Sequence, residues 1–245
     1  MHSHVAAELK ARDRERWLAC LWAPAAARPA VLALHALDAG LQRIVADIRD
    51  PLLAEIRLAW WREQLLLLAR GAAPPAQPLL RLLAFEARAR VDLERLAQLE
   101  DAFLPLVTDG RFDPRAHARA RGALLFEALF AAGGGAGGAG RAAARTAGEQ
   151  WAIAALWRDR WGHAAARVQE CRARLLPPAD LPRSAAALPA TLAALAGLAR
   201  ADLAALAAGR PLAPPATAGR QLRMALSALG LERRRGKMLA APPHS

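Results

Sequence analysis

The stretch 50–65 predicts a long helix that needs neighbours on more than one side. Asp50 is a typical helix cap, and Pro51 fits a first turn, where its missing N–H costs nothing. Two adjacent tryptophans, Trp60 and Trp61, project about 100° apart on a helix, so burying both requires packing on two flanks. We therefore expect this helix at the centre of a helical bundle.

An apolar stripe recurs along the same helix at three- and four-residue spacing, through Leu53, Ile56 and Trp60. Tryptophan pairs of this kind form core far more often than a ligand pocket. Arg57 and Arg62 stand beside the indoles, where a guanidinium can stack on a ring or hold phosphate oxygens. A surface role for these arginines is equally open.

Composition favours an all-α chain. The 245 residues are 55% hydrophobic, tyrosine is absent, and alanine, leucine, arginine and glutamate dominate. Apolar residues at helical spacing predict one bundle over residues 1–232, followed by a disordered basic and proline-rich tail over 233–245. The further helices are expected over 13–24, 30–48, 79–107 with one break, 114–130, 145–171, 188–208 and 220–231.

Two local patterns invite a stronger interpretation than they support. The run 133–140 matches a dinucleotide-binding spacing by letter, but no strand precedes it, so we expect a flexible loop. Asp159 and His163 are one helical turn apart and could share a metal or a proton, but no third ligand is local, and a solvated polar face is the simpler interpretation.

The net charge of +12 is carried almost entirely by arginine, since Lys10 and Lys237 are the only lysines. Such basicity fits an anionic partner, including a lipid surface bound in a salt-dependent way, as well as it fits the codon bias of a GC-rich genome. No helix-turn-helix, zinc-finger or RNA-binding signature accompanies the charge, so nucleic acid is not the expected partner.

The two cysteines, Cys20 and Cys171, lie in no CxxC pattern, and we expect both to be buried and reduced. The first sixteen residues are charged, and no window of about 18 uninterrupted apolar residues occurs. The expected location is the cytoplasm, with a peripheral association at the inner membrane as an open alternative.

The chain resembles the squalene/phytoene synthase family over most of its length and in the right order. The most specific element is Ile-Arg-Leu-x-Trp-Trp-Arg within Glu55–Arg62. The other matching segments are Asp13–Pro24, Ala30–Ala46, Ala154–Asp159 and Leu175–Pro177. The resemblance implies a bundle of the isoprenoid-synthase type around a central cavity. Active members of that family join two prenyl diphosphates head to head with Mg²⁺ held by paired aspartates.

This sequence departs from the family at those aspartates. Gln42 and Ala46 stand where the first pair belongs, and the second pair keeps Asp159 but has His163 in place of its partner. A lone carboxylate with a histidine is a poor cage for Mg²⁺, which prefers oxygen ligands. Leu175 also replaces the usual tyrosine of a Tyr-Leu-Pro run. The sequence is thus similar to the divergent branch that includes a mitochondrial complex I assembly factor.

Two hypotheses follow from the resemblance. The preferred one is a catalytically degenerate protein that needs no cofactor and binds an isoprenoid, a lipid or a protein partner. The alternative is an active Mg²⁺-dependent prenyltransferase with a reduced site. The candidate metal ligands are Asp38, Asp47 and Asp159; the candidate diphosphate-binding residues are Arg57, Arg62 and Arg158; and the expected framework of the cavity is Trp17, Trp60 and Trp61.

Overall fold

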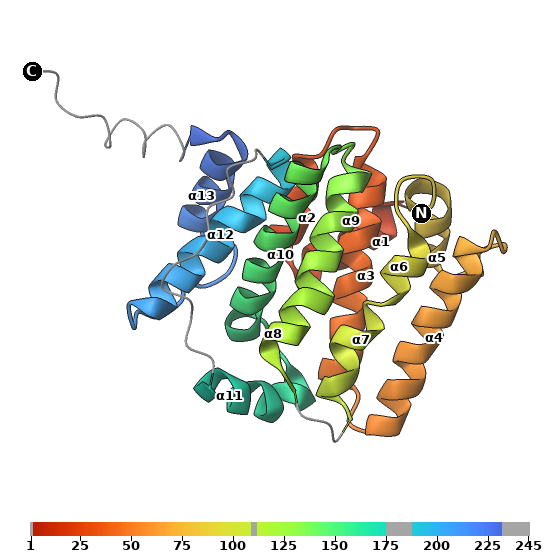
Figure 1. The fold of residues 1–245 in the computed structure, drawn as a ribbon, viewed down its shortest axis with the longest axis horizontal. Coiled ribbons are helices and arrows are strands. Elements are labelled where there is room, and N and C mark those ends of the chain that lie inside the picture. The colour runs from red at the N-terminus through yellow and green to blue at the C-terminus, as the bar shows by residue number, and fades with distance from the viewer. Residues whose placement is uncertain (1, 109–111, 175–187, 232–245) are drawn as a thin grey trace, which may run out of the picture.

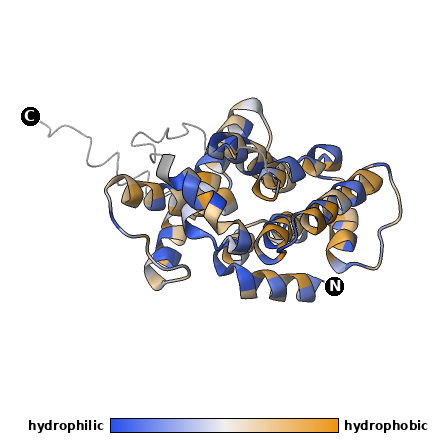
Figure 2. Cartoon of the chain, turned by 90° about the horizontal axis from the view of Figure 1, so that it is seen from below, coloured by the Kyte–Doolittle hydropathy of each residue, from blue (hydrophilic) through white to orange (hydrophobic). Residues whose placement is uncertain are grey.

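The computed structural model describes residues 2–108, 112–174 and 188–231, and within these ranges every regular element is helical. The all-α prediction is confirmed. The tail 233–245 and Leu175, on which two sequence arguments depended, lie outside the described residues. Polar and apolar residues alternate along the same helices in Figure 2, which is the pattern of amphipathic helices packed around a shared core.

The first four helices set the frame of the molecule. They are α1 (His2–Arg12), α2 (Arg14–Leu21), α3 (Arg28–Asp47) and α4 (Pro51–Ala69). α3 lies in the interior and packs against α1, α2, α4, α5, α7 and α9, whereas α4 lies at one edge (Figure 1). Leu37 and Leu41 are among its fully buried residues, as their spacing predicts. The central helix is therefore α3, and the expectation that the 50–65 helix is central was wrong.

α4 buries a different stripe from the predicted one. Ala54 and Leu58 are fully buried where α4 packs against α6 and α7, while Leu53 is 44%, Ile56 56% and Trp60 39% exposed. Both stripes carry large apolar residues, so their spacing alone could not decide which one faces the bundle. Ile56 and Trp60 line a groove that is described below.

The segment 79–107 was predicted as a helix with one break and is instead divided several times. Its elements are α5 (Pro78–Leu82), the π-helix η1 (Leu83–Ala87), α6 (Leu93–Ala97), α7 (Glu100–Phe103) and the 3₁₀ helix η2 (Leu104–Leu106). Asp92 caps α6 by accepting from the Arg95 backbone N–H at 3.0 Å, which fixes one of the new starts. Phe85, expected on the apolar face, is 67% exposed.

The second half of the chain contains the remaining helices, of which α9 and η4 pack against α3. They are α8 (Pro114–His117), the π-helix η3 (Ala118–Ala123), α9 (Leu124–Ala132), α10 (Gly138–Arg158), the 3₁₀ helix η4 (Gly162–Ala164), α11 (Ala165–Arg174), α12 (Ala190–Ala207) and α13 (Ala218–Ala228). By length and composition α12 could cross a membrane, but more than half of it is buried inside the bundle, as expected of a core helix.

η3 and α10 make the closest helix crossing, at Gly122 and Gly148. A Cβ on either glycine would stand 2.0 Å from the backbone oxygen of the other. The glycine run 133–140 serves a related purpose, because Cβ atoms on Gly135 and Gly140 would collide with the ring of Phe130. The run is a loop only as far as Gly137, and α10 begins directly after it.

Candidate functional site

The interior position at which the resemblance implies metal-binding turns holds a buried cluster of arginines and carboxylates. Four guanidiniums face five carboxylates and one amide, so the charges nearly balance. This buried ion cluster consists of Asp13, Glu15, Arg16, Asp38, Gln42, Arg121, Arg158, Asp159, Asp202 and Arg220.

Asp38 is the centre of the cluster and is completely buried. Arg121 on η3 donates from Nε to Oδ1 at 2.9 Å and from Nη2 to Oδ2 at 2.8 Å, a bidentate pair. Arg16 on α2 donates from Nη1 to the same Oδ2 at 2.6 Å. Burial by itself would raise the pKa of Asp38, but Arg121 and Arg16 lower it to about 2. This carboxylate is therefore ionised and fully occupied.

Gln42 joins the two arginines. Its Oε1 accepts from Arg16 Nη2 at 3.0 Å and from Arg121 Nη2 at 3.1 Å. Asp159 approaches from the other side, with Oδ2 3.8 Å from both guanidiniums. The neutral amide keeps the charges near balance, since an aspartate at position 42 would add one more negative charge to this buried site.

A second part of the cluster ties the C-terminal helices to α2. Arg220 on α13 donates to Glu15 from Nε at 2.6 Å and from Nη2 at 3.0 Å, and its other contacts are with Asp202 on α12. Arg158 pairs with Asp159 at 3.2 Å and with Asp202 at 3.5 Å, which joins the two parts. The cluster thus connects five helices and η3.

Aromatic rings surround the guanidinium groups. The Cζ atom of Arg121 lies 4.9 Å from the ring centre of Trp151, 5.2 Å from that of Phe103 and 5.5 Å from that of Trp161. Arg16 approaches the Trp151 ring at 5.1 Å. These cation–π contacts and the burial of most of the cluster place its ion pairs in a low-dielectric interior, where each pair is stronger than at the surface.

The side chains of the cluster do not fit a magnesium site. Both Asp38 oxygens are hydrogen-bonded to guanidiniums, and two arginines stand between this carboxylate and Asp159. Asp47, the third candidate, is exposed and pairs with Arg43 at 3.6 Å. Asp38 and Asp159 therefore converge, Asp47 does not, and a cation between the first two would have to displace two positive charges.

The Asp159–His163 pair was predicted on one helix, and this was wrong. α10 ends at Arg158, and Asp159 is extended, with φ −77° and ψ 154°. Gly162, at φ +49°, then turns the chain against α3, where a Cβ would stand 2.0 Å from the Ala46 carbonyl oxygen. The break aims Asp159 into the cluster and leaves His163 exposed.

A second candidate site is a hollow of about 570 Å³ beside α4. It lies between α1, α3, α4 and α5, and we call it the α4 groove. Its floor includes the small residues Ala36, Ala39 and Gly40 of α3, and its α4 wall is formed by Ile56, Arg57, Trp60 and Trp61. The two indoles meet edge to face, with ring centres 5.3 Å apart. Arg12, Arg43 and Glu8 also line it, so apolar side chains meet three arginines and one carboxylate in this hollow.

The three arginines predicted to bind diphosphate do not come together. Arg57 lines the α4 groove, Arg158 is buried in the ion cluster, and Arg62 is exposed and pairs with Glu100 at 3.6 Å. Burial raises the pKa of Glu100, and Arg62 offsets part of that effect. Of the three arginines predicted to bind diphosphate, Arg57 alone lines the α4 groove.

The three tryptophans expected to frame one cavity do not lie around the same hollow. Trp60 and Trp61 line the α4 groove rather than an interior cavity, and Trp17 is half-buried with Lys10 Nζ 4.6 Å from its ring centre. Helix α2 buries the charged residues Glu15 and Arg16 and leaves the apolar residues Leu21 and Trp22 exposed.

Sequence reasoning missed the main cationic groups, Arg16, Arg121 and Arg220. Each is buried against acidic partners that are distant in sequence, 205 positions away in the case of Arg220 and Glu15. The available signal was weak: Asp13 and Arg16 stand three apart at a helix start, and Asp202 interrupts the apolar stripe of α12. Cys20 is buried as predicted, with its pKa raised to about 12 by burial, whereas the side chain of Cys171 lies outside the described part.

Comparisons with family models, with curated proteins and with solved structures found no match for this chain. The functional argument therefore depends on the geometry of the ion cluster and of the α4 groove.

Proposed function

We propose that this protein is a squalene/phytoene synthase-like helical protein that has lost metal-dependent catalysis and binds an isoprenoid or another lipid in the α4 groove. The observation that carries the proposal is the pairing of an apolar hollow with arginines at its walls. A prenyl or acyl chain would lie against Ile56, Trp60 and Trp61, and its anionic head group would meet Arg57 or Arg43.

The ion cluster supports the non-catalytic part of the proposal. A head-to-head prenyltransferase needs carboxylates that are free to bind Mg²⁺, whereas Asp38 is saturated by Arg16 and Arg121. The side chain at position 42 is an amide that accepts from the same two arginines. In this proposal the interior has become a structural core, and ligand binding has a separate place at the edge of the bundle.

Calorimetric titration of the full chain with farnesyl and geranylgeranyl diphosphate, with and without Mg²⁺, tests the proposal. We expect saturable binding that Mg²⁺ does not change and no release of pyrophosphate. Gly40→Leu would fill the groove, since no atom lies within 4 Å of the added Cβ, and should weaken binding at least about tenfold. Gly219→Leu, at another open helical position, is the matched control and should bind like the unchanged protein.

The transferase alternative has one observation in its favour, the convergence of Asp38 and Asp159 on the same two arginines. It requires Mg²⁺-dependent turnover that Asp38→Asn abolishes. Pyrophosphate release with that dependence would establish the alternative and would contradict the non-catalytic proposal.

A protein partner or a peripheral membrane contact is the other form of the proposal. Leu52 and Leu53 on α4 are exposed and extend the apolar surface of the groove wall residue Ile56. If the protein binds no prenyl diphosphate with or without Mg²⁺, this surface becomes the candidate binding site for a protein partner or a membrane.

A further inference from the structure

A second arginine-rich hollow lies on the other side of the bundle from the α4 groove. Its volume is about 160 Å³, and it is bounded by α6, α7, η3, α9 and α10. We call it the Arg119 pocket. Its lining residues are Arg95, Gln98, Asp101, Arg119, Ala120, Ala123, Leu124 and Arg145.

A buried carboxylate positions the arginines of this pocket. Glu127 on α9 is only 10% exposed and receives Arg95 in a bidentate contact, Nη1–Oε1 3.1 Å and Nη2–Oε2 2.8 Å. The same carboxylate meets Arg145 at 3.4 Å and Arg141 at 3.6 Å. One negative charge thus holds three guanidiniums in fixed positions, each still 41–59% exposed.

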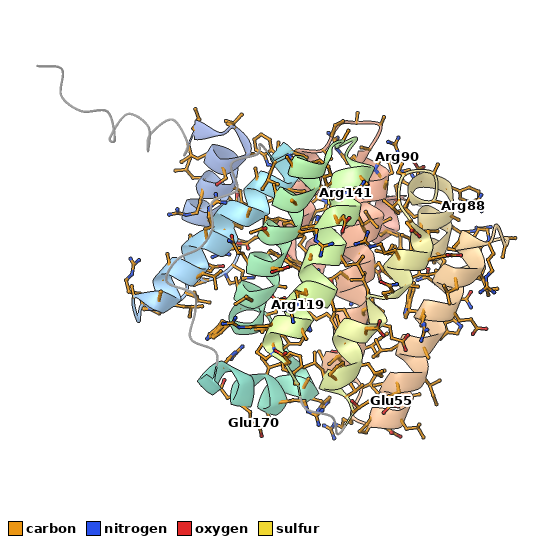
Figure 3. The ribbon with its side chains drawn as sticks, in the orientation of Figure 1. Glu55, Arg88, Arg90, Arg119, Arg141 and Glu170 are labelled. Atoms are coloured by element: carbon orange, nitrogen blue, oxygen red, sulfur yellow. The ribbon has the colours of Figure 1, made fainter. Side chains whose placement is uncertain are left out.

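The positive charge of the group exceeds what the protein compensates. Arg95, Arg119 and Arg145 line the hollow together with Asp101, and Glu127 pairs with two of these arginines, so three positive charges meet two negative ones. Figure 3 shows Arg119 and Arg141 at different heights along neighbouring helices of the bundle. The arginines that line the same hollow repel one another, and an anion that enters the hollow relieves that repulsion.

We propose that the Arg119 pocket binds a phosphate-type dianion. The excess positive charge of the lining attracts a phosphate group, and guanidinium groups form paired N–H contacts with phosphate oxygens. Gln98 adds an amide donor at the rim, and Ala120, Ala123 and Leu124 give the hollow an apolar floor that strengthens the ionic contacts. The site is independent of the α4 groove and of any isoprenoid ligand.

Titration calorimetry of the full chain with inorganic phosphate at constant ionic strength tests this site. Arg119→Gln should weaken binding about tenfold, since it removes a lining guanidinium that forms no hydrogen bond or ion pair within the described residues. Arg88→Gln, an exposed arginine near α5 in Figure 3, removes the same charge elsewhere and should change affinity less than twofold. Asp101→Asn should tighten binding about threefold, because it removes a negative charge from the wall.

The source of the phosphate group is decided by two further probes. Glycerol 3-phosphate binding that depends on Arg119 identifies a soluble phosphate ester, and attachment to phosphatidic acid vesicles with the same dependence identifies a lipid head group. Equal losses in Arg119→Gln and Arg88→Gln would reveal only a diffuse positive field and would overturn the proposal. Absence of saturable phosphate binding, or binding to a single-stranded oligonucleotide alone, would overturn it as well.

Discussion

Asp38 and Arg121 form a bidentate ion pair between α3 and η3 in which both side chains are completely inaccessible to solvent. Removing one partner of such a pair leaves a buried charge without full compensation. Arg121→Met should therefore lower the free energy of unfolding by about 3–5 kcal/mol in urea titrations followed by circular dichroism.

The control for this substitution is on the same element. Arg119→Met removes an exposed arginine two positions earlier and should stay within about 0.5 kcal/mol of the unchanged protein. Equal stability of the two variants would contradict a structural role for the Asp38–Arg121 pair.

The crossing of η3 and α10 gives a second prediction. Gly148→Ala would place a Cβ 2.0 Å from the Gly122 backbone oxygen, so the helices must separate. We expect a loss of about 3 kcal/mol in the free energy of unfolding. Gly219→Ala has no atom within 4 Å of the new Cβ and should gain up to about 1 kcal/mol. A neutral Gly148→Ala would mean that the crossing is looser than this geometry.

A helix was predicted well from the sequence when the spacing of its apolar residues also determines which face packs against the bundle. α3 has one dominant apolar stripe through Leu37 and Leu41, and it is buried as expected. α4 carries two competing stripes, and the choice between them depends on α6 and α7, which local spacing does not describe. The break after Arg158 was missed for the same reason, since it depends on a close contact between Gly162 and Ala46.

The ion cluster could not be predicted from the spacing of residues within single helices, because its partners are far apart in the sequence. α2 buries Glu15 and Arg16 because their partners Asp38 and Arg220 lie on α3 and α13, which an argument from the apolar residues of α2 alone does not consider. Asp38 and Asp159 were singled out as metal ligands from their positions near the family motif. The arginines between them, which reach the site from α2 and η3, were not singled out from the sequence.

Two buried histidines predict a loss of stability in mild acid. Burial, reinforced by Arg16, lowers the pKa of His35 to about 4, and burial with Arg121 nearby lowers that of His117 to about 3. Above pH 6.5 both are neutral in the folded and unfolded chain. As the pH falls from 6.5 to 4, the unfolded chain binds protons that the folded chain does not, so each histidine costs about 3 kcal/mol.

Urea titrations between pH 7.5 and 4.5 measure this slope. His35→Leu should reduce the number of protons taken up on unfolding by about one relative to the unchanged protein. The Asp38 carboxylate acts in a different window, because its stabilising effect is lost only between pH 3.8 and about 2. An unchanged slope in His35→Leu would contradict a buried neutral imidazole at this position.

Arg220 makes α13 depend on α2 and α12, and this dependence can be measured locally. Arg220→Met leaves Glu15 and Asp202 buried without their main partner, so α13 should detach in preference to unfolding of the whole chain. Hydrogen exchange of the backbone amides over Ala218–Ala228 should accelerate about a hundredfold, while α3 changes far less. Arg210→Met, an exposed arginine just before this segment, should change neither helix. Uniform acceleration across α3 and α13 would instead mean that the cluster stabilises the bundle as one cooperative unit.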